Sequence, residues 1–195
     1  MIEKEKVTET FCPTNKKEWR QWLQDNHNTK KGVWLVQYKK KSGKSTISWS
    51  ESVDEALCFG WIDSIRKTID EDSFIQFFGK RKPTSVWSKI NKEKVKLLIE
   101  NNLMTNAGIA SIEIAKQNGS WTILDEVEEL IIPSDLAQAF NLNEGSSAYF
   151  LSLSNSVRKS ILQWLVFAKR PETRQNRINE ISELATQKLK PKQFR

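Results

Sequence analysis

The chain has 195 residues, of which 38% are hydrophobic and 28% charged, with seven glycines and five prolines. This length and composition suit one globular domain or two small ones, and they exclude a fibrous or wholly disordered chain. The 31 basic and 24 acidic residues give a formal net charge of +7, which would favour anionic partners without selecting one.

Targeting and redox signals are few. The longest apolar runs, such as residues 164–168, fall far short of the ~18 residues that a membrane span needs. The N-terminal sequence MIEKEKVTETF lacks the apolar stretch of a secretory signal, so we expect a cytoplasmic protein. Cys12 and Cys58 have neither disulfide nor metal-ligand spacing, and we expect two free thiols, no metal and no cofactor.

The first predicted elements are a helix and a β-hairpin. Residues 15–26 place Trp19, Trp22 and Leu23 at helical spacing, and Thr14 is available as the N-cap. Residues 33–39 and 45–49 are rich in β-forming side chains and flank the turn sequence KKSGK. This arrangement predicts that the two segments pair as a hairpin.

A second helix and a second strand pair are expected next. Residues 51–59 form the helix, with Ser50 or Ser52 as its cap, Ser52 and Glu55 matching a capping box, and Gly60 suited to its C-terminal end. Residues 61–69 alternate as a strand, and residues 74–78 follow an acidic turn. These two segments predict an antiparallel pair.

Helical periodicity dominates from residue 88 onward. Helices are predicted over residues 91–101, over 105–117 and over 135–141, the last with Ser134 as its cap. A further helix runs to residue 168 from Ser154 or Ser156, and a last one begins at Pro171. The fold class is therefore α+β: a small antiparallel sheet with two helices, followed by an all-helical unit. We place the division between residues 1–87 and 88–195, with one compact unit as the alternative.

Two segments concentrate aromatic, charged and thiol side chains: ISWSESVDEALCFGWID at residues 47–63 and RKPTSVWSKIN at residues 81–91. They predict a pocket for a small anionic or planar ligand, or for a partner, because arginine offers a planar fork and tryptophan a stacking surface. Its predicted lining is Trp49, Glu55, Cys58, Asp63, Arg81, Ser85 and Trp87, with Arg66 and Asn91 as supports. Taken singly, each of these residues is more often a core residue or an ion-pair partner than a ligand contact.

Catalysis is an alternative reading of the same segments. Glu55 or Asp63 could act as a general base, although paired carboxylates are common in sequences. Nucleophilic chemistry at Cys58 would need a base, and the single histidine, His27, lies in a polar loop.

The basic residues are concentrated in two stretches. Residues 16–44 carry nine basic against two acidic residues, and residues 169–195 carry eight against three. In the second stretch Lys169, Arg170, Arg174 and Arg177 form a candidate basic stripe on a helix. Such surfaces could bind nucleic acid, but a solvated face is the commoner outcome. Pairing of the stripe with the acidic residues at 125–129 is equally consistent with the pattern.

Four motifs together resemble one known family. They are GVWL at residues 32–35, W-x-E-x-x-x-E-A-L-C-F-G-W-I-D at 49–63, R-x-x-x-S-x-W-S-x-x-N at 81–91 and AKRPETR at 168–174. This combination is similar to the YdeI/OmpD-associated family, also called the OmdA-like or bacteriocin-protection family, over roughly residues 10–185. The resemblance implies a small bacterial protein with a role in envelope stress or antimicrobial-peptide resistance. It implies no assigned catalytic residues.

Overall fold

The computed structural model describes residues 9–195, and the chain divides into two compact units, residues 1–121 and 122–195. The sequence placed the division near residue 88. The first unit continues further because helices α3 (Lys89–Glu100) and α4 (Asn106–Gln117) both pack against α2 (Trp49–Cys58). Val95 of α3 and Ile112 of α4 lie in the same buried cluster as Leu57 of α2.

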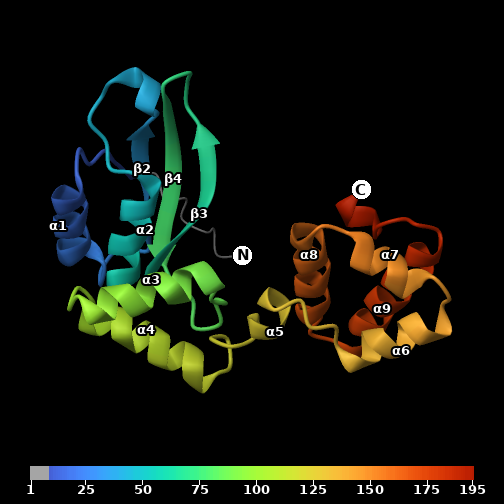
Figure 1. The fold of residues 1–195 in the computed structure, drawn as a ribbon. Helices are drawn as coiled ribbons and strands as arrows, with labels where there is room; N and C mark the ends of the chain where they lie inside the picture. Colours follow the sequence, from blue (N-terminus) through green and yellow to red (C-terminus); the bar gives the residue numbers. More distant parts are fainter. Residues whose placement is uncertain (1–8) are drawn as a thin grey trace, which may run out of the picture. The chain divides into compact units, whose positions relative to one another are not determined.

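The first unit is built on a four-stranded mixed sheet (Figure 1). Its strands are β1 (Thr10–Phe11), β2 (Gly32–Tyr38), β3 (Trp61–Thr68) and β4 (Ser73–Lys80), in the spatial order β1-β2-β4-β3. The predicted antiparallel pair of β3 and β4 is confirmed, and β4 also pairs antiparallel with β2. The short strand β1 runs parallel to β2 and makes the sheet mixed.

The predicted hairpin between residues 33–39 and 45–49 is wrong. β2 pairs with β4 along its whole length, and the following residues form a short 3₁₀ helix, Lys40–Ser42. Residues 45–47 run beside β2 through side-chain contacts: Tyr38 N donates to Thr46 Oγ1 at 3.2 Å, and Gln37 Nε2 donates to Ile47 O at 3.1 Å. Ile47 packs into the core, where it is 2% exposed. This burial decides the conformation of the segment in spite of the β propensity of the Ile47 side chain.

Polar side chains cap the helices of the first unit, but two of the caps lie at other residues than predicted. α1 (Lys16–Asn26) is capped by Asn15, one residue after the expected Thr14. α2 begins at Trp49 with a capping box between Ser48 and Glu51, four residues before the expected one. The cap of α4 at Thr105 is confirmed.

The second unit is all-helical, as predicted. It contains α5 (Asp125–Glu128), α6 (Ser134–Leu142), α7 (Ser146–Ser152), α8 (Asn155–Val166), α9 (Pro171–Thr186) and the 3₁₀ turn Lys192–Phe194. Of the two candidates Ser154 and Ser156, Ser154 caps α8, and Pro171 opens α9 as predicted. The expected cap at Ser134 is wrong, because Ser134 is the first residue of α6 and Pro133 precedes it. The hydrophobic periodicity of the sequence did not indicate the short helices α5 and α7.

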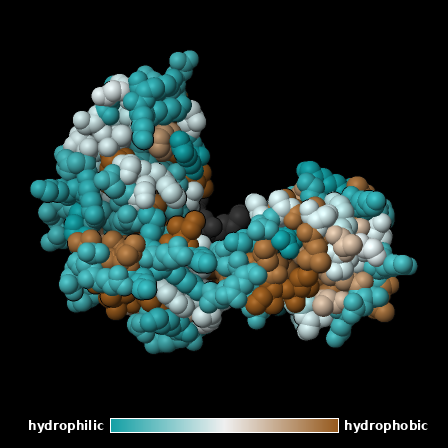
Figure 2. Space-filling view, viewed as in Figure 1, coloured by the Kyte–Doolittle hydropathy of each residue, from teal (hydrophilic) through white to brown (hydrophobic). Residues whose placement is uncertain are grey.

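The core of the first unit lies between the sheet and its helices. α1 and α2 cover one face of the sheet (Figure 1), and Trp19 of α1 is fully buried beside Phe78 of β4, with ring centroids 5.4 Å apart. Hydrophobic residues reach the surface over α3 and α4 (Figure 2). No helix within residues 9–195 is long and apolar enough to cross a membrane.

Candidate functional site

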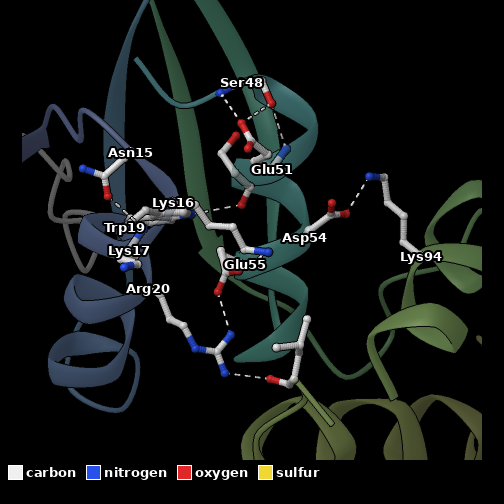
Figure 3. A network of polar contacts seen from close by, with 12 residues as sticks. Asn15, Lys16, Lys17, Trp19, Arg20, Ser48, Glu51, Asp54, Glu55 and Lys94 are labelled. Carbon is white, nitrogen blue, oxygen red and sulfur yellow. Dashed lines mark hydrogen bonds and ion pairs between the residues drawn. The ribbon is translucent and has the colours of Figure 1, made fainter. Parts of the chain in front are cut away.

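Glu55 is held inside the first unit by two cations from α1 (Figure 3). Its side chain is fully buried; Oε2 lies 2.7 Å from Arg20 Nη1, and Oε1 lies 3.1 Å from Lys16 Nζ. Arg20 Nη2 also donates to Leu103 O at 2.8 Å, so one guanidinium joins α1, α2 and the loop before α4. Oε2 accepts the hydrogen bond from Arg20, whereas the buried Oε1 pairs with the charge of Lys16 and has no hydrogen-bond partner among the described residues. The two ion pairs give Glu55 a structural role, because they hold α1 against α2.

Cys58 lies on the same side of α2 as Glu55. Its side chain is fully buried, and burial raises the pKa of the thiol to about 11, with the charge of Glu55 adding to the effect and Arg20 opposing it. At neutral pH the sulfur is therefore a neutral thiol, which is a poor nucleophile. The contacts of Glu55 and Cys58 go to α1 and the loop before α4.

Trp49 and Asp63 are brought together, as the predicted pocket required. Trp49 Nε1 donates to Asp63 Oδ2 at 2.9 Å, and Gln76 Nε2 donates to the same oxygen at 3.2 Å. Arg66, predicted as a support, instead lies over the ring of Phe74, with its Cζ atom 3.7 Å from the centroid. This group tethers the start of α2 to β3 across the edge of the sheet.

Arg81 and Trp87 form a second pair from the predicted site. The guanidinium carbon lies 3.7 Å from the centroid of the Trp87 ring, and Nη1 donates to Val86 O at 3.2 Å. Nε is buried and has no hydrogen-bond partner among the described residues. Burial lowers the pKa of the Arg81 guanidinium to about 10, and the charge of Asp63 opposes part of that shift. Arg81 thus remains a cation at neutral pH, but one that is poorly solvated.

Ser85 and Asn91 belong to the turns around this pair. Ser85 Oγ accepts a hydrogen bond from Lys82 N at 3.2 Å, and Asn91 N donates to Ser88 Oγ at 3.3 Å in the first turn of α3. Trp87 is 1% exposed and packs on Trp121 with ring centroids 5.0 Å apart. Ser85 therefore closes the turn that follows Arg81, and Asn91 contributes its backbone N–H to the first turn of α3.

A cavity of about 460 Å³ opens beside Arg81. Its basic residues are Lys80, Arg81 and Lys82, and none of the described residues that line it is acidic. The opposite wall is one face of α4: Ala107, Ala110, Ser111 and Ile114, at helical spacing. The volume falls within the range of small-molecule pockets, ~300–1,000 Å³. The cavity therefore combines a cationic side with a largely apolar wall.

Two glycines allow the backbone packing beneath this cavity. Gly60 has φ +72°, and a Cβ there would lie 2.9 Å from Ala107 O; a Cβ on Gly108 would lie 2.3 Å from Cys58 O. The end of α2 and the start of α4 therefore meet backbone to backbone, and Thr105 Oγ1 donates to Cys58 O at 2.6 Å. Only residues without a side chain fit at these two points.

The predicted site is thus distributed over separate places. Arg81, Trp87 and their loop border the cavity, Trp49 pairs with Asp63, and Glu55 and Cys58 face α1. Sequence reasoning missed Arg20, Lys16 and the α4 wall. An acidic residue in the middle of the apolar face of α2 was the available signal for a cationic partner, and the small residues in N-A-G-I-A-S were the signal for close helix packing.

The candidate basic stripe of the second unit is partly paired. Arg174 forms a bidentate contact with Asp135, with Nε to Oδ2 at 2.6 Å and Nη2 to Oδ1 at 3.0 Å. Arg177 lies over the ring of Trp164, 4.7 Å from its centroid, and donates to Trp164 O. Lys169 and Arg170 are exposed. Intramolecular pairing therefore accounts for half of the stripe, with Asp135 as the acid in place of residues 125–129.

Metal binding has no support in the described part of the chain. No group of three or more His, Cys, Asp or Glu side chains within residues 9–195 is arranged to hold a metal ion.

An α+β unit with a cavity bordered by Lys80, Arg81 and Lys82, followed by a helical unit, is the class of protein that this geometry defines. The chain belongs to the family described as a domain of unknown function, DUF8412, whose model matches residues 11–111. Residues 129–188 match a second family model, described as "Bacteriocin-protection, YdeI or OmpD-Associated", which confirms the resemblance there. No match was found among curated proteins or among solved structures.

Proposed function

We propose that the first unit binds a small organic anion in the cavity beside Arg81. The observation that carries this proposal is the Arg81 guanidinium: it is poorly solvated, its Nε lacks an acceptor, and it borders a cavity without carboxylates. A carboxylate or phosphate in the cavity would pair with the Arg81 cation through a charge-assisted hydrogen bond. The apolar face of α4 would contact the organic part of the ligand.

We also propose that the protein serves bacteriocin protection. This part is supported by the description of the family model that matches residues 129–188. Binding of an anionic ligand in the first unit would then be the molecular activity, and the second unit would carry the family-specific part of the role. Expression in a bacteriocin-sensitive strain, with survival scored against an empty vector, tests this role directly.

The binding proposal is tested with matched probes. Thermal stability is measured with 1-naphthoate, hexanoate and phenyl phosphate, each paired with its neutral counterpart: 1-naphthalenemethanol, hexanol and phenol. We expect at least one anion to raise the melting temperature in a concentration-dependent manner, because a ligand of the folded state stabilises it. If no anion exceeds its neutral counterpart, the proposal is refuted.

Two matched variants locate the site. Arg81→Met keeps an unbranched side chain over Trp87 and removes the guanidinium; a charge-assisted hydrogen bond is worth about 1.5–3 kcal/mol, so binding should weaken roughly ten- to hundredfold. Arg66→Met is the control, because Arg66 also lies over an aromatic ring at 3.7 Å but does not line the cavity. Equal losses in both variants would contradict the assignment.

A further inference from the structure

The cavity beside Arg81 has an excess of positive charge on one side. Lys80, Arg81 and Lys82 line it, and its other described lining residues are uncharged. Among the described residues, Asp63 is the acid whose charge acts on the pKa of Arg81, and Asp63 does not line the cavity. Even when Asp63 is counted against the three cations, this side keeps an excess of two positive charges. A ligand with two negative charges would therefore balance it better than a monoanion.

The two lysines of this side have no partner of their own in the protein. Lys80 and Lys82 are exposed, and neither ammonium group makes a hydrogen bond or ion pair with the described part of the chain. Arg81 lies between them in sequence and is fixed over the ring of Trp87. The cationic side thus consists of one fixed guanidinium flanked by two unpaired ammonium groups.

The loop that carries these cations is anchored to the rest of the first unit. Arg81 N donates to Gly60 O at 3.0 Å, just after the end of β4. Pro83 O accepts hydrogen bonds from Asn118 Nδ2 at 2.8 Å and from Ser120 Oγ at 3.4 Å, beyond the end of α4. Because these contacts already fix the loop backbone, little conformational entropy would be lost there when a ligand binds.

The opposite wall suits an organic group and not a second anionic group. Its α4 residues Ala107, Ala110 and Ile114 have no polar side-chain atoms. Ser111 Oγ donates its proton to Gly108 O at 2.7 Å, so this hydroxyl is used within the helix. The α4 wall therefore offers no free side-chain donor to an anion, and a matching ligand has a charged head and an apolar body.

We propose that the cavity selects small organic phosphomonoesters, with the phosphate beside Lys80, Arg81 and Lys82 and the organic group on the α4 wall. This inference rests on the binding function proposed above and narrows its ligand class. A phosphomonoester carries about −1.5 to −2 charges at neutral pH and three acceptor oxygens, whereas a carboxylate or a sulfate ester carries one charge. The guanidinium would bind phosphate oxygens through its planar fork, and the two lysines would act as point charges.

The test compares phenyl phosphate with phenyl sulfate, which has the same ring and a tetrahedral head group with a single charge. Dissociation constants are measured by isothermal titration calorimetry of the full chain in a phosphate-free buffer at pH 7.5. We expect phenyl phosphate to bind about fivefold more tightly or better, because the upper value for one additional exposed ion pair corresponds to about that factor.

The ionisation of the ligand gives a second readout. A phosphomonoester loses its second proton near pH ~6, so the affinity for phenyl phosphate should rise about threefold between pH 5 and pH 7.5. The affinity for phenyl sulfate should change less than about twofold, since its charge is constant. Phenyl sulfate also corrects for protonation of His27, whose ring packs on the cavity residue Phe59 with centroids 5.1 Å apart.

Three variants and a control assign the two ends of the ligand. Lys80→Gln and Lys82→Gln should each weaken binding of phenyl phosphate about two- to fivefold and reduce its advantage over phenyl sulfate. Lys96→Gln, which removes an exposed lysine that does not line this cavity, should bind like the unaltered protein. Ala110→Leu extends the α4 wall into the cavity and should weaken phenyl phosphate about fivefold or more, but not inorganic phosphate. Circular dichroism verifies that each variant is folded.

The outcomes separate this inference from the broader binding function. Equal affinities for phenyl phosphate and phenyl sulfate would overturn the selection of phosphomonoesters, while leaving the binding of organic anions in place. Equal affinities for phenyl phosphate and inorganic phosphate would overturn the role of the organic group. If none of these anions and no carboxylate binds, both proposals are refuted.

Discussion

Removal of the buried charge at Glu55 should destabilise the first unit by about 2–3 kcal/mol. Glu55→Gln keeps the shape of the side chain but leaves Arg20 and Lys16 without their counter-ion. The charge-assisted bond to Arg20 at 2.7 Å contributes about 1.5–3 kcal/mol. Lys16 is 43% exposed in its side chain, so its share is at most ~1 kcal/mol. The sum is about 1.5–4 kcal/mol, with its middle at about 2–3 kcal/mol. That middle lies below the ~3–5 kcal/mol of a fully buried pair because both cations retain access to water.

The assay is urea denaturation followed by tryptophan fluorescence and circular dichroism, with the transition of the first unit fitted separately. A separate mutant cycle compares Glu55→Met alone, Arg20→Met alone and the double variant that carries both changes. We expect a coupling energy of about 1.5–3 kcal/mol, since each single change leaves one buried partner unmatched. Additive effects, or a Glu55→Gln loss below about 0.5 kcal/mol, would refute the structural role of this ion pair.

Three further predictions follow from other contacts. Gly108→Ala should destabilise the first unit by about 2 kcal/mol or more in the same urea assay, because its Cβ would lie 2.3 Å from Cys58 O; a change within 0.5 kcal/mol would contradict the backbone contact. Iodoacetamide at pH 8 should label exposed Cys12 and spare Cys58, whose pKa burial raises to about 11, until urea unfolds the chain; mass spectrometry of the native protein shows which site reacts. The hydrogen bond from Arg174 lowers the pKa of Asp135 in the folded protein. The contribution of this pair to the free energy of unfolding is therefore complete above the unfolded pKa of ~3.9 and is lost as pH falls through the folded pKa. Asp135→Asn should abolish this pH dependence of stability. The free energy of unfolding lost should be less than about 1 kcal/mol, because the Asp135 side chain is 40% exposed. An unchanged pH profile of unfolding would exclude the bond as its source.

Local signals predicted the helical part of the chain well. Ser154, Thr105 and Pro171 act at helix starts through contacts within one turn, so a short window of sequence contains the whole interaction. The pair of β3 and β4 was likewise visible because a tight acidic turn joins two alternating segments. Such elements need no knowledge of distant residues.

The errors arose where distant residues decide the structure. Residues 45–47 have β-forming side chains, but β2 finds its partner in β4, about forty residues further along the chain. Glu55 looked like a candidate ligand or base until Arg20, 35 residues away, proved to be its partner. The α4 wall of the cavity depends on Gly60 and Gly108, whose contact involves two separate helices. Pairwise tertiary contacts of this kind leave no periodic trace in a single sequence.

The bond from Arg20 to Leu103 O has a consequence for biosynthesis. It joins residues 83 positions apart, so the guanidinium cannot complete its contacts until the loop before α4 has been translated. At about 5–20 residues per second, that interval lasts roughly 4–17 s. During this time α1 and α2 can meet, but the cation between them lacks its third partner. A nascent chain arrested before residue 103 should therefore expose an incomplete domain that is a substrate for chaperones and proteases.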